Sequence, residues 1–399
     1  MVRSEPGVRR ARGVTLADVA RHAGVSTSAV SRALNKPGRL GAATEARIQA
    51  SAAELGYRLN PVARALQTGR TRMIAVMLSD LTNPVYSGFV RGAEAVTTAA
   101  GYTLLFAESH DSPELEIASV DRLAQAVDGV LLMGPRVDDA EVLALAERTP
   151  VVVVNREVAG LPTLVPDLTT AIDDVVAHLH AHGHRSLGWI AGPPASWASR
   201  RRRELLGAAA ASRGLDVVDL GPYAATLEGG GEAATAVLAS GATAVVAYND
   251  LVALGLIAQL RERGVAVPDD LSVVGFDDIF GAALASPALT TVRSPLGKAG
   301  DAAVRLLLAE IEGTEPEAAP ALPAELVLRA STGPAPPPNP SRGLSGPLAR
   351  PFRSGREALW GPVARPFGSG RGALQGSSAA TAVSTPRSSA SPIRRPMRG

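Results

Sequence analysis

The sequence predicts an α/β protein in which a small, all-helical N-terminal domain precedes a two-lobed body of doubly wound parallel sheets. Residues 14–57 contain three short helical patterns with capping signals. Residues 73–332 alternate apolar, strand-like runs with helical stretches rich in Ala, Leu and Val, which is typical of parallel sheets. About 260 residues of this alternation exceed one such sheet. We therefore expect two lobes with a cleft between them.

The helical patterns of the N-terminal domain can be placed from their capping residues. Thr15 can cap the first helix, with Asp18 in the capping-box position three residues later. A second helix begins near Ser26, and a third runs from about Thr44 to Leu55 before Gly56. We expect a further brief helical segment at residues 60–66, followed by a polar link at residues 67–72.

The first two helices have the spacing of a helix-turn-helix motif. Ala20 is small enough for two helices to cross closely, and Gly24 tolerates the positive φ of a tight turn. Thr27, Ser28 and Arg32 are then exposed at the start of the second helix, where they suit the major groove of DNA. Five apolar residues form the predicted buried side: Leu16, Val19, Val25, Val30 and Leu34. A helical bundle without a DNA-binding role is the alternative interpretation of this motif alone.

The predicted strands of the body follow from its apolar runs, at residues 73–78, 103–107, 129–132, 151–154, 186–190, 244–247 and 272–274. The expected domains are an arm at 1–13, a helix-turn-helix domain at 14–58, a hinge and linker at 59–72, and a body at 73–332. The first lobe of the body would hold about 73–166 and 294–322, and the second about 167–293 and 323–332. From residue 333 to 399, Pro, Ser, Gly and Arg dominate, and we expect disorder.

Charge is distributed unevenly along the 399 residues. Residues 1–72 hold 13 basic and 4 acidic side chains, residues 73–332 hold 17 and 33, and residues 333–399 hold 10 and 1. A basic head on an acidic body predicts that the head binds a polyanion. The tail also contains a near-repeat, 349–359 and 364–374, which either has no function or attracts nucleic acid nonspecifically.

Composition excludes several classes of protein. The chain has no cysteine, so disulfides and thiolate metal sites are absent. Its apolar runs are shorter than the roughly 18 residues of a membrane-spanning helix, and residues 1–12 lead into no apolar segment. We expect a cytoplasmic protein that does not contact a membrane.

Nine ordered motifs lie along residues 14–332. They are 14–26 (VTLADVARHAGVS), 30–35 (VSRALN), 53–57 (AELGY), 60–66 (NPVARAL), 80–84 (DLTNP), 183–185 (GHR), 248–250 (YND), 273–278 (VVGFDD) and 289–292 (LTTV). In this order they resemble the LacI/GalR family of bacterial repressors. The resemblance implies a periplasmic-binding-protein-like body, operator DNA with a pseudo-palindromic sequence, and a homodimer or a tetramer. It also implies a small effector, a sugar or a sugar derivative, without a cofactor.

The same resemblance implies the residues that bind DNA. Residues 60–66 resemble the hinge helix that orders on the operator, and Leu66 the side chain that wedges into the minor groove. Packing between domains is the alternative role of Leu66. The full set of expected DNA-binding residues is Thr15, Ser26, Thr27, Ser28, Ser31, Arg32, Asn35, Tyr57, Asn60, Ala63 and Leu66.

Ligands of doubly wound sheets bind at the carboxyl ends of the strands, and several polar residues occupy such ends. The expected effector-binding residues are Asp80, Tyr86, Asn155, Arg202, Tyr223, Asn249 and Asp277. Helix capping is the structural alternative for each Asp or Asn, and the preferred role for Asp250 and Asp278. Leu205, Leu168 and Asn155 depart from the residues usual in the family. Residues 200–203 are all arginine, so the sequence leaves the position of the effector-binding arginine open by one residue.

Other features favour structural roles. His178, His180, His182 and His184 form two helical pairs on different faces, which makes a weak metal site, so we expect no bound metal. Gly229-Gly230-Gly231 is expected in a turn, since no phosphate-loop or nucleophile-elbow motif is present. We expect no enzyme. A sugar-binding protein of the periplasmic type without a regulatory role is the alternative, but it leaves the helix-turn-helix unexplained.

Overall fold

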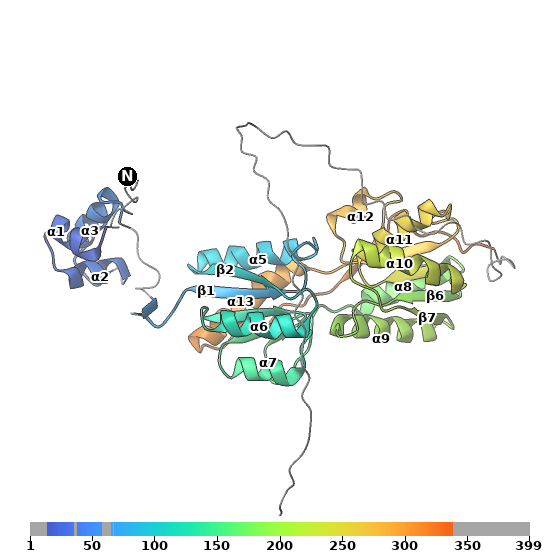
Figure 1. Cartoon of the computed structure of the whole chain (residues 1–399), viewed down its shortest axis with the longest axis horizontal. Coiled ribbons are helices and arrows are strands. Elements are labelled where there is room, and N and C mark those ends of the chain that lie inside the picture. The colour runs from blue at the N-terminus through green and yellow to red at the C-terminus, as the bar shows by residue number, and fades with distance from the viewer. Residues whose placement is uncertain (1–13, 36–37, 58–64, 67, 338–399) are drawn as a thin grey trace, which may run out of the picture. The chain divides into compact units, whose positions relative to one another are not determined.

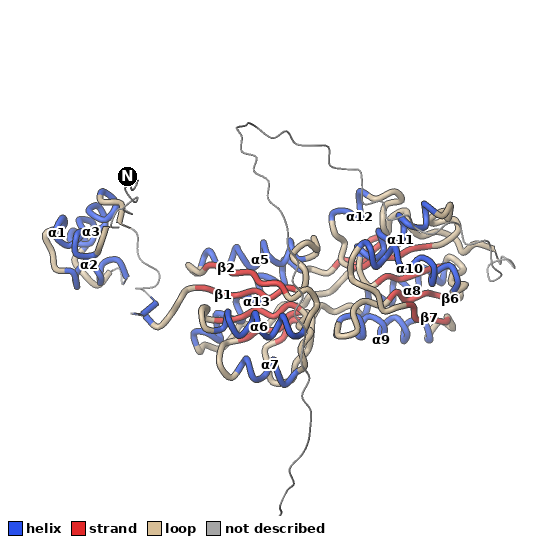
Figure 2. Tube along the Cα trace, viewed as in Figure 1, coloured by secondary structure: helices blue, strands red, loops and turns tan. Residues whose placement is uncertain are grey.

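The computed structural model describes residues 14–35, 38–57, 65–66 and 68–337 (Figures 1 and 2). The expected arm at 1–13, most of the hinge segment and residues 338–399 lie outside this description. The described residues form a three-helix domain and two α/β lobes.

The three-helix domain contains α1 (Leu16–Ala23), α2 (Thr27–Asn35) and α3 (Ala42–Glu54). The capping box of α1 is present, because Thr15 and Asp18 satisfy each other's backbone N–H groups. Gly24 ends α1 at φ 64°, a left-handed conformation that a glycine adopts without strain. The predicted side is buried or half-buried around Val19, Val30 and Ile48. Helix α3 begins two residues before the predicted Thr44.

Lobe 1 is a parallel sheet in the order β2-β1-β3-β4-β5. Its strands are β1 (Met73–Leu78), β2 (Thr103–Glu108), β3 (Gly129–Met133), β4 (Val151–Val154) and β5 (Thr163–Leu164). Its helices are α5 (Tyr86–Ala99), α6 (Pro113–Ala124), α7 (Asp139–Ala146) and α13 (Leu296–Glu312). Helix α13 returns from far along the chain to pack on α5.

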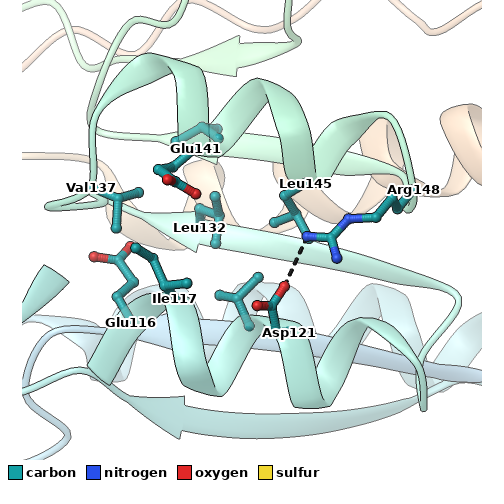
Figure 3. Close-up of a pocket in the computed structure, with 10 residues that line it drawn as sticks. Glu116, Ile117, Asp121, Leu132, Val137, Glu141, Leu145 and Arg148 are labelled. Carbon is teal, nitrogen blue, oxygen red and sulfur yellow. Dashed lines mark hydrogen bonds and ion pairs between the residues drawn. The ribbon is translucent and has the colours of Figure 1, made fainter. Parts of the chain in front are cut away.

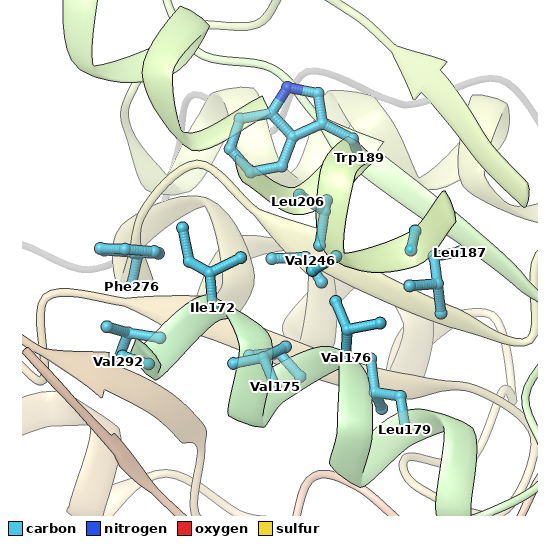
Figure 4. Packing of buried hydrophobic residues seen from close by; sticks show 14 of the residues in the cluster. Ile172, Val175, Val176, Leu179, Leu187, Trp189, Leu206, Val246, Phe276 and Val292 are labelled. Carbon is cyan, nitrogen blue, oxygen red and sulfur yellow. The ribbon is translucent and has the colours of Figure 1, made fainter. Parts of the chain in front are cut away.

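Lobe 2 has the strand order β11-β10-β9-β8-β6-β7, with only β11 antiparallel to its neighbour. Its strands are β6 (Ser186–Ile190), β7 (Asp216–Leu220), β8 (Ala244–Ala247), β9 (Ser272–Phe276), β10 (Thr290–Arg293) and β11 (Glu325–Val327). Its helices are α8 (Thr169–Ala181), α9 (Trp197–Ala211), α10 (Leu227–Ala239), α11 (Asp250–Glu262) and α12 (Phe280–Leu284). Figure 4 shows aliphatic side chains of α8 packed with Trp189, Val246 and Phe276 from three strands.

The seven predicted strands are present, with ends that differ by at most two residues. The described residues contain four further strands, β5, β7, β10 and β11. Strand β5 has only two residues, and β7 and β11 lie at the edges of their sheet with charged residues at their ends. Such strands carry little of the apolar signal on which the prediction depends.

The prediction of a turn at residues 229–231 is wrong, because these glycines lie inside α10. They serve a close crossing of two helices instead. A Cβ atom on Gly230 would lie 2.1 Å from the carbonyl oxygen of Val252, and one on Gly255 would lie 1.9 Å from that of Leu227. Helix α10 can therefore approach α11 only where side chains are missing.

The predicted start of the tail at residue 333 is also wrong. Gly333 is buried, its N–H donates to Ser272 Oγ at 3.1 Å, and its carbonyl accepts from His184 Nε2 at 3.1 Å. The N–H of Ala335 donates to the carbonyl of His182 at 2.7 Å. Lobe 2 thus extends at least to residue 337.

Candidate functional site

The exposed start of α2 carries the residues predicted to read DNA bases. Thr27, Ser28 and Arg32 are exposed, while Ser31 is half-buried. Ser26 precedes the helix, and its Oγ accepts from the N–H of Ala29 at 3.2 Å. Because this cap and the turn at Gly24 fix the helix from one end, its first residues have a defined direction.

The remaining predicted DNA-binding residues have diverse surroundings. Thr15 is exposed but uses its hydroxyl in the cap of α1, and Tyr57 is half-buried against the domain core. Asn35 is the last residue of α2. Leu66 is helical and 89% exposed, so no described side chain covers it. Asn60 and Ala63 lie outside the described residues.

A pocket of about 670 Å³, including space open to solvent, is lined by residues from both lobes. We call it the effector pocket, after the effector-binding residues predicted from the sequence, and define it by its lining residues: Ser79, Asp80, Asn83, Val85, Tyr86, Asp111, Met133, Arg136, Asn155, Pro166, Arg202, Ala225, Thr226, Tyr248, Asn249, Asp277, Ser294 and Leu296. Six of the seven predicted effector residues are among them.

Lobe 2 contributes a buried ion pair to the effector pocket. Arg202 lies on α9 and is 5% exposed, and Asp277 directly follows β9. The Nη2 of Arg202 donates to Asp277 Oδ1 at 3.2 Å. Its guanidinium also donates to the carbonyl of Tyr248 and stacks over the ring of Phe276, 3.8 Å from the centroid. Its Nε is buried and has no hydrogen-bond partner among the described residues. Burial raises the pKa of Asp277 to about 6, although Arg202 acts in the opposite direction.

The neighbouring arginines have other partners, which favours Arg202 in the register that the sequence left open by one position. Arg200 donates to the carbonyl of Pro194 at 3.0 Å, Arg201 pairs with Glu204 at 3.5 Å, and Arg203 pairs with Asp219. Of these four arginines, only Arg202 lines the effector pocket.

The predicted helix-capping roles can be compared with the hydrogen bonds and ion pairs of Asn249, Asp250 and Asp278. Asn249 lines the pocket but caps α11, accepting from the N–H of Val252 at 2.9 Å, so helix capping falls to Asn249 rather than Asp250. Asp250 accepts from Thr291 Oγ1 at 2.6 Å and from the N–H of Ile279 at 2.8 Å. Burial, and next the charge of Asp277, raise the pKa of Asp250 to about 8. Asp278 caps no helix and pairs with Arg293 and Arg329.

Lobe 1 places hydroxyl, amide and carboxyl groups around the same pocket. Tyr86 lies 2.7 Å from Ser79 through their hydroxyl oxygens, and burial raises the pKa of Tyr86 to about 12. Asp80 accepts from the N–H and hydroxyl of Thr82, and Asn155 follows β4. Arg136 and Asp111, which sequence reasoning missed, pair here at 2.9 Å. They belong to loops without a family motif, so only their positions after β3 and β2 could have indicated them.

Unusual backbone conformations gather at this pocket. Asp111, Asn155 and Asp277 have φ values of 58°, 60° and 107°, a region that residues with a Cβ seldom adopt. Each such residue stores about 1–3 kcal/mol of strain, which the surrounding structure must offset. Their concentration on pocket loops indicates a functional site.

Comparison with known proteins identifies the family. The profile described as bacterial regulatory proteins, lacI family, matches residues 15–60, and the periplasmic binding protein-like domain matches 176–332. The HTH-type transcriptional repressor CytR of Escherichia coli strain K12 is 34% identical over 329 residues, covering 80% of this chain and 96% of CytR. The regulator MalR of Streptomyces coelicolor is 35% identical over 340 residues, covering 80% and 97%. This chain belongs to the LacI family.

Solved structures agree with this membership. The Lac repressor dimer bound to operator and the anti-inducer ONPF matches with a TM-score of 0.73 and 27% identity, covering 81% of this chain and all of the other. A complex of the regulator CelR with cellobiose matches with a TM-score of 0.58 and 29% identity, covering 80% and 99%. The protein is a DNA-binding transcriptional regulator, and the alternative of a sugar-binding protein without a regulatory role is set aside. Its relatives are regulators rather than enzymes, as predicted.

The structure places Tyr223 away from the pocket to which it was predicted to belong, and it gives histidines at 178–184 structural partners. Tyr223 does not line the effector pocket, because it packs against the core between β7 and α11, with its N–H bound to the carbonyl of Ala191. Two of the histidines form hydrogen bonds between segments that are distant in the sequence. His178 is hydrogen-bonded to Thr332, and His184 to both Thr243 and Gly333. Among the described residues no group of three or more His, Asp or Glu side chains could hold a metal.

A second hollow, between α6 and α7 of lobe 1, contains none of the predicted effector residues (Figure 3). Its floor is aliphatic, with Leu132 and Leu145, and Asp121 pairs with Arg148 across it at 2.8 Å. We therefore assign no role to it. In the described parts of the chain, no helix is long and apolar enough to cross a membrane.

Proposed function

We propose that this LacI-family regulator represses transcription as a homodimer on pseudo-palindromic operator DNA, and that a sugar or sugar derivative in the effector pocket controls its operator affinity. The observation that carries the effector assignment is the buried Arg202–Asp277 pair in that pocket. A forked guanidinium beside a carboxylate offers donors and an acceptor side by side, which matches two neighbouring hydroxyl groups.

For DNA, we propose that Thr27, Ser28 and Arg32 contact bases in the major groove. Their exposure at the start of α2, and the fixed direction of that helix, support this role. Leu66 would enter the minor groove, since an exposed leucine has little else in the described structure to bury against.

Two sets of exposed apolar side chains support a dimer. In lobe 1, Phe106 on the edge strand β2 and Leu115 on α6 are 40% and 48% exposed. In lobe 2, Phe280 and Leu284 on α12 are 72% and 78% exposed. A two-fold interface would cover such surfaces and would prevent the edge strand from pairing nonspecifically.

The effector assignment is tested by exchanging one arginine for lysine, which keeps the charge but loses the forked donors. Wild type, Arg202→Lys and, as a matched control, Arg201→Lys would be titrated with monosaccharides, disaccharides and ribonucleosides. Operator binding would be measured by fluorescence anisotropy on DNA from upstream of the protein's own gene. We expect Arg202→Lys to lose the effector response, with basal operator affinity kept, and Arg201→Lys to respond normally. A normal response of Arg202→Lys would contradict the assignment.

A further inference from the structure

The lobe 1 side of the effector pocket holds a second buried pair, Arg136 with Asp111. The side chain of Arg136 is 6% exposed, and its Nε donates to Asp111 Oδ1 at 2.9 Å. Its Nη1 donates to the carbonyl of Gly134 at 2.6 Å. Within the described part of the chain, its Nη2 makes no hydrogen bond, although both residues line the pocket. One donor of the fork is thus free for a ligand.

The surroundings hold Arg136 in place before any ligand arrives. Its backbone N–H donates to Glu116 Oε2 at 2.7 Å, and Glu116 is itself buried on α6. Gly134 turns the chain after β3 with φ 58°, and Asp111 has the same φ value. Asp111 is strained at this φ value, whereas Gly134 is not, and Arg136 is a cation buried beside a pocket. We take the strain at Asp111 and the buried cation together to favour ligand binding over a purely structural role.

The charges of the pocket restrict what the free donor can bind. Each arginine already has its own carboxylate partner, and Asp80 adds a third carboxylate to the lining. Three carboxylates against two guanidinium groups leave no excess positive charge for a phosphate. A ligand with neutral oxygen acceptors next to hydroxyl donors therefore fits this lining better than a phosphorylated ligand does.

We propose that Arg136 and Asp111 form a second polar grip on the effector, and that the effector is an uncharged, unphosphorylated glycoside or nucleoside with a polar edge for each lobe. One edge would bind Arg202 and Asp277, and the other Arg136 and Asp111. This inference rests on the proposed function, because it assumes that the effector occupies this pocket.

Isothermal titration of the full chain tests the proposal with defined probes: cellobiose, uridine, uridine 5′-monophosphate, D-ribose and D-ribose 5-phosphate. We expect cellobiose or uridine to bind wild type, which distinguishes the glycoside from the nucleoside, and the phosphorylated probes to bind at least about tenfold more weakly than their parent compounds. Arg136→Met should weaken binding about 10–100-fold, as expected for losing a hydrogen bond from a charged group. Arg136→Lys should recover part of the loss.

A separate charge readout distinguishes ligand contact from a structural role. Asp111→Asn should raise the affinity for uridine 5′-monophosphate relative to uridine, because it removes a negative charge from the pocket wall. Asp121→Asn, which changes the Asp121–Arg148 pair of the other hollow (Figure 3), is the matched control and should leave that ratio unchanged. A purely structural role would lower the melting temperature of the Asp111 and Arg136 variants without changing the ratio.

The possible failures separate the two proposals. Normal binding by Arg136→Met, together with loss of binding by Arg202→Lys, would overturn the second grip and leave the proposed function intact. Equal or tighter binding of the phosphorylated probes would overturn the uncharged class. If no uncharged probe binds wild type, or if Arg202→Lys binds normally, the sugar-class effector site is wrong and this inference falls with it.

Discussion

The two lobes bring the same chemical pair to the effector pocket but hold it differently. In lobe 1, Arg136 lies in a loop, and hydrogen bonds from its side chain and its backbone fix it to Asp111, Gly134 and Glu116. In lobe 2, Arg202 lies on α9 with a buried Nε that no described residue binds. Its partner Asp277 is 9% exposed at the side chain, against 27% for Asp111.

This difference indicates in which lobe the stability of the pocket wall depends more on its ion pair. Asp111 can turn to water when its arginine is lost, whereas Asp277 would remain buried without a cation. The lobe 2 wall is therefore the more sensitive one. Burial raises the pKa of Asp277 in this wall and that of Asp250 behind it. The following experiments can sharpen or break this comparison.

Loss of the lobe 2 arginine should have the largest effect. Arg202→Met leaves Asp277 buried and unpaired, and breaking such a pair costs about 3–5 kcal/mol of unfolding free energy. Arg136→Met should cost less, because its partner is more exposed. Urea unfolding measures the loss of unfolding free energy in the two variants. Arg148→Met, which breaks an exposed ion pair, is the control and should lose less than about 1 kcal/mol. Equal losses at the two walls would remove the distinction.

The pH dependence of stability should also be concentrated in lobe 2. The pKa of Asp250 is raised from 3.8 to about 8, so the native state binds a proton that the unfolded chain releases. Stability from this group is therefore present below about pH 4 and falls as pH rises toward about 8. Asp250→Asn imitates the neutral acid and should gain stability relative to wild type between pH 5 and pH 8, by on the order of a few kcal/mol. Unfolding curves of both proteins that shift in parallel over this range would refute the assignment.

The glycine crossing of lobe 2 allows a matched pair of substitutions. Gly230→Ala places a Cβ 2.1 Å from the carbonyl oxygen of Val252 and should destabilise by about 1–3 kcal/mol through overpacking. Gly231→Ala in the same helix meets no atom closer than 3.9 Å and should be neutral or stabilise by up to about 1 kcal/mol. Thermal unfolding distinguishes them, and a loss at Gly231 as large as at Gly230 would argue against close packing as the cause.

The end of lobe 2 should give effects no larger than those at the glycine crossing. A chain that ends at Thr332 loses the hydrogen bonds of Gly333 and Ala335, at a cost of roughly 1–3 kcal/mol. A chain that ends at Pro337 keeps them and should retain the wild-type melting temperature and operator specificity. Equal melting temperatures for the two truncations would show that this segment adds nothing to lobe 2.

Much of this protein follows from local sequence. The capping box at Thr15, the turn at Gly24 and the apolar spacing of α1 and α2 act within 20 residues of one another, so the helix-turn-helix was predicted together with its exposed face. The apolar runs predicted seven strands because buried parallel strands need no distant partner to show their pattern. The family resemblance predicted Arg202 and Asp277 each as an effector-binding residue, with the register of the arginine open, but it did not predict that the two would pair.

Tertiary structure alone decided the rest. Glycines 229–231 look like a turn until α11 lies against α10, and Gly333 looks like tail until His184 and Ser272 bind it. Tyr223 was assigned to the pocket, yet it packs in a core whose other members come from distant strands and helices. Arg136 and Asp111 are 25 residues apart in two unremarkable loops. They meet because β2 and β3 flank β1 in a parallel sheet, whose carboxyl ends gather at one edge.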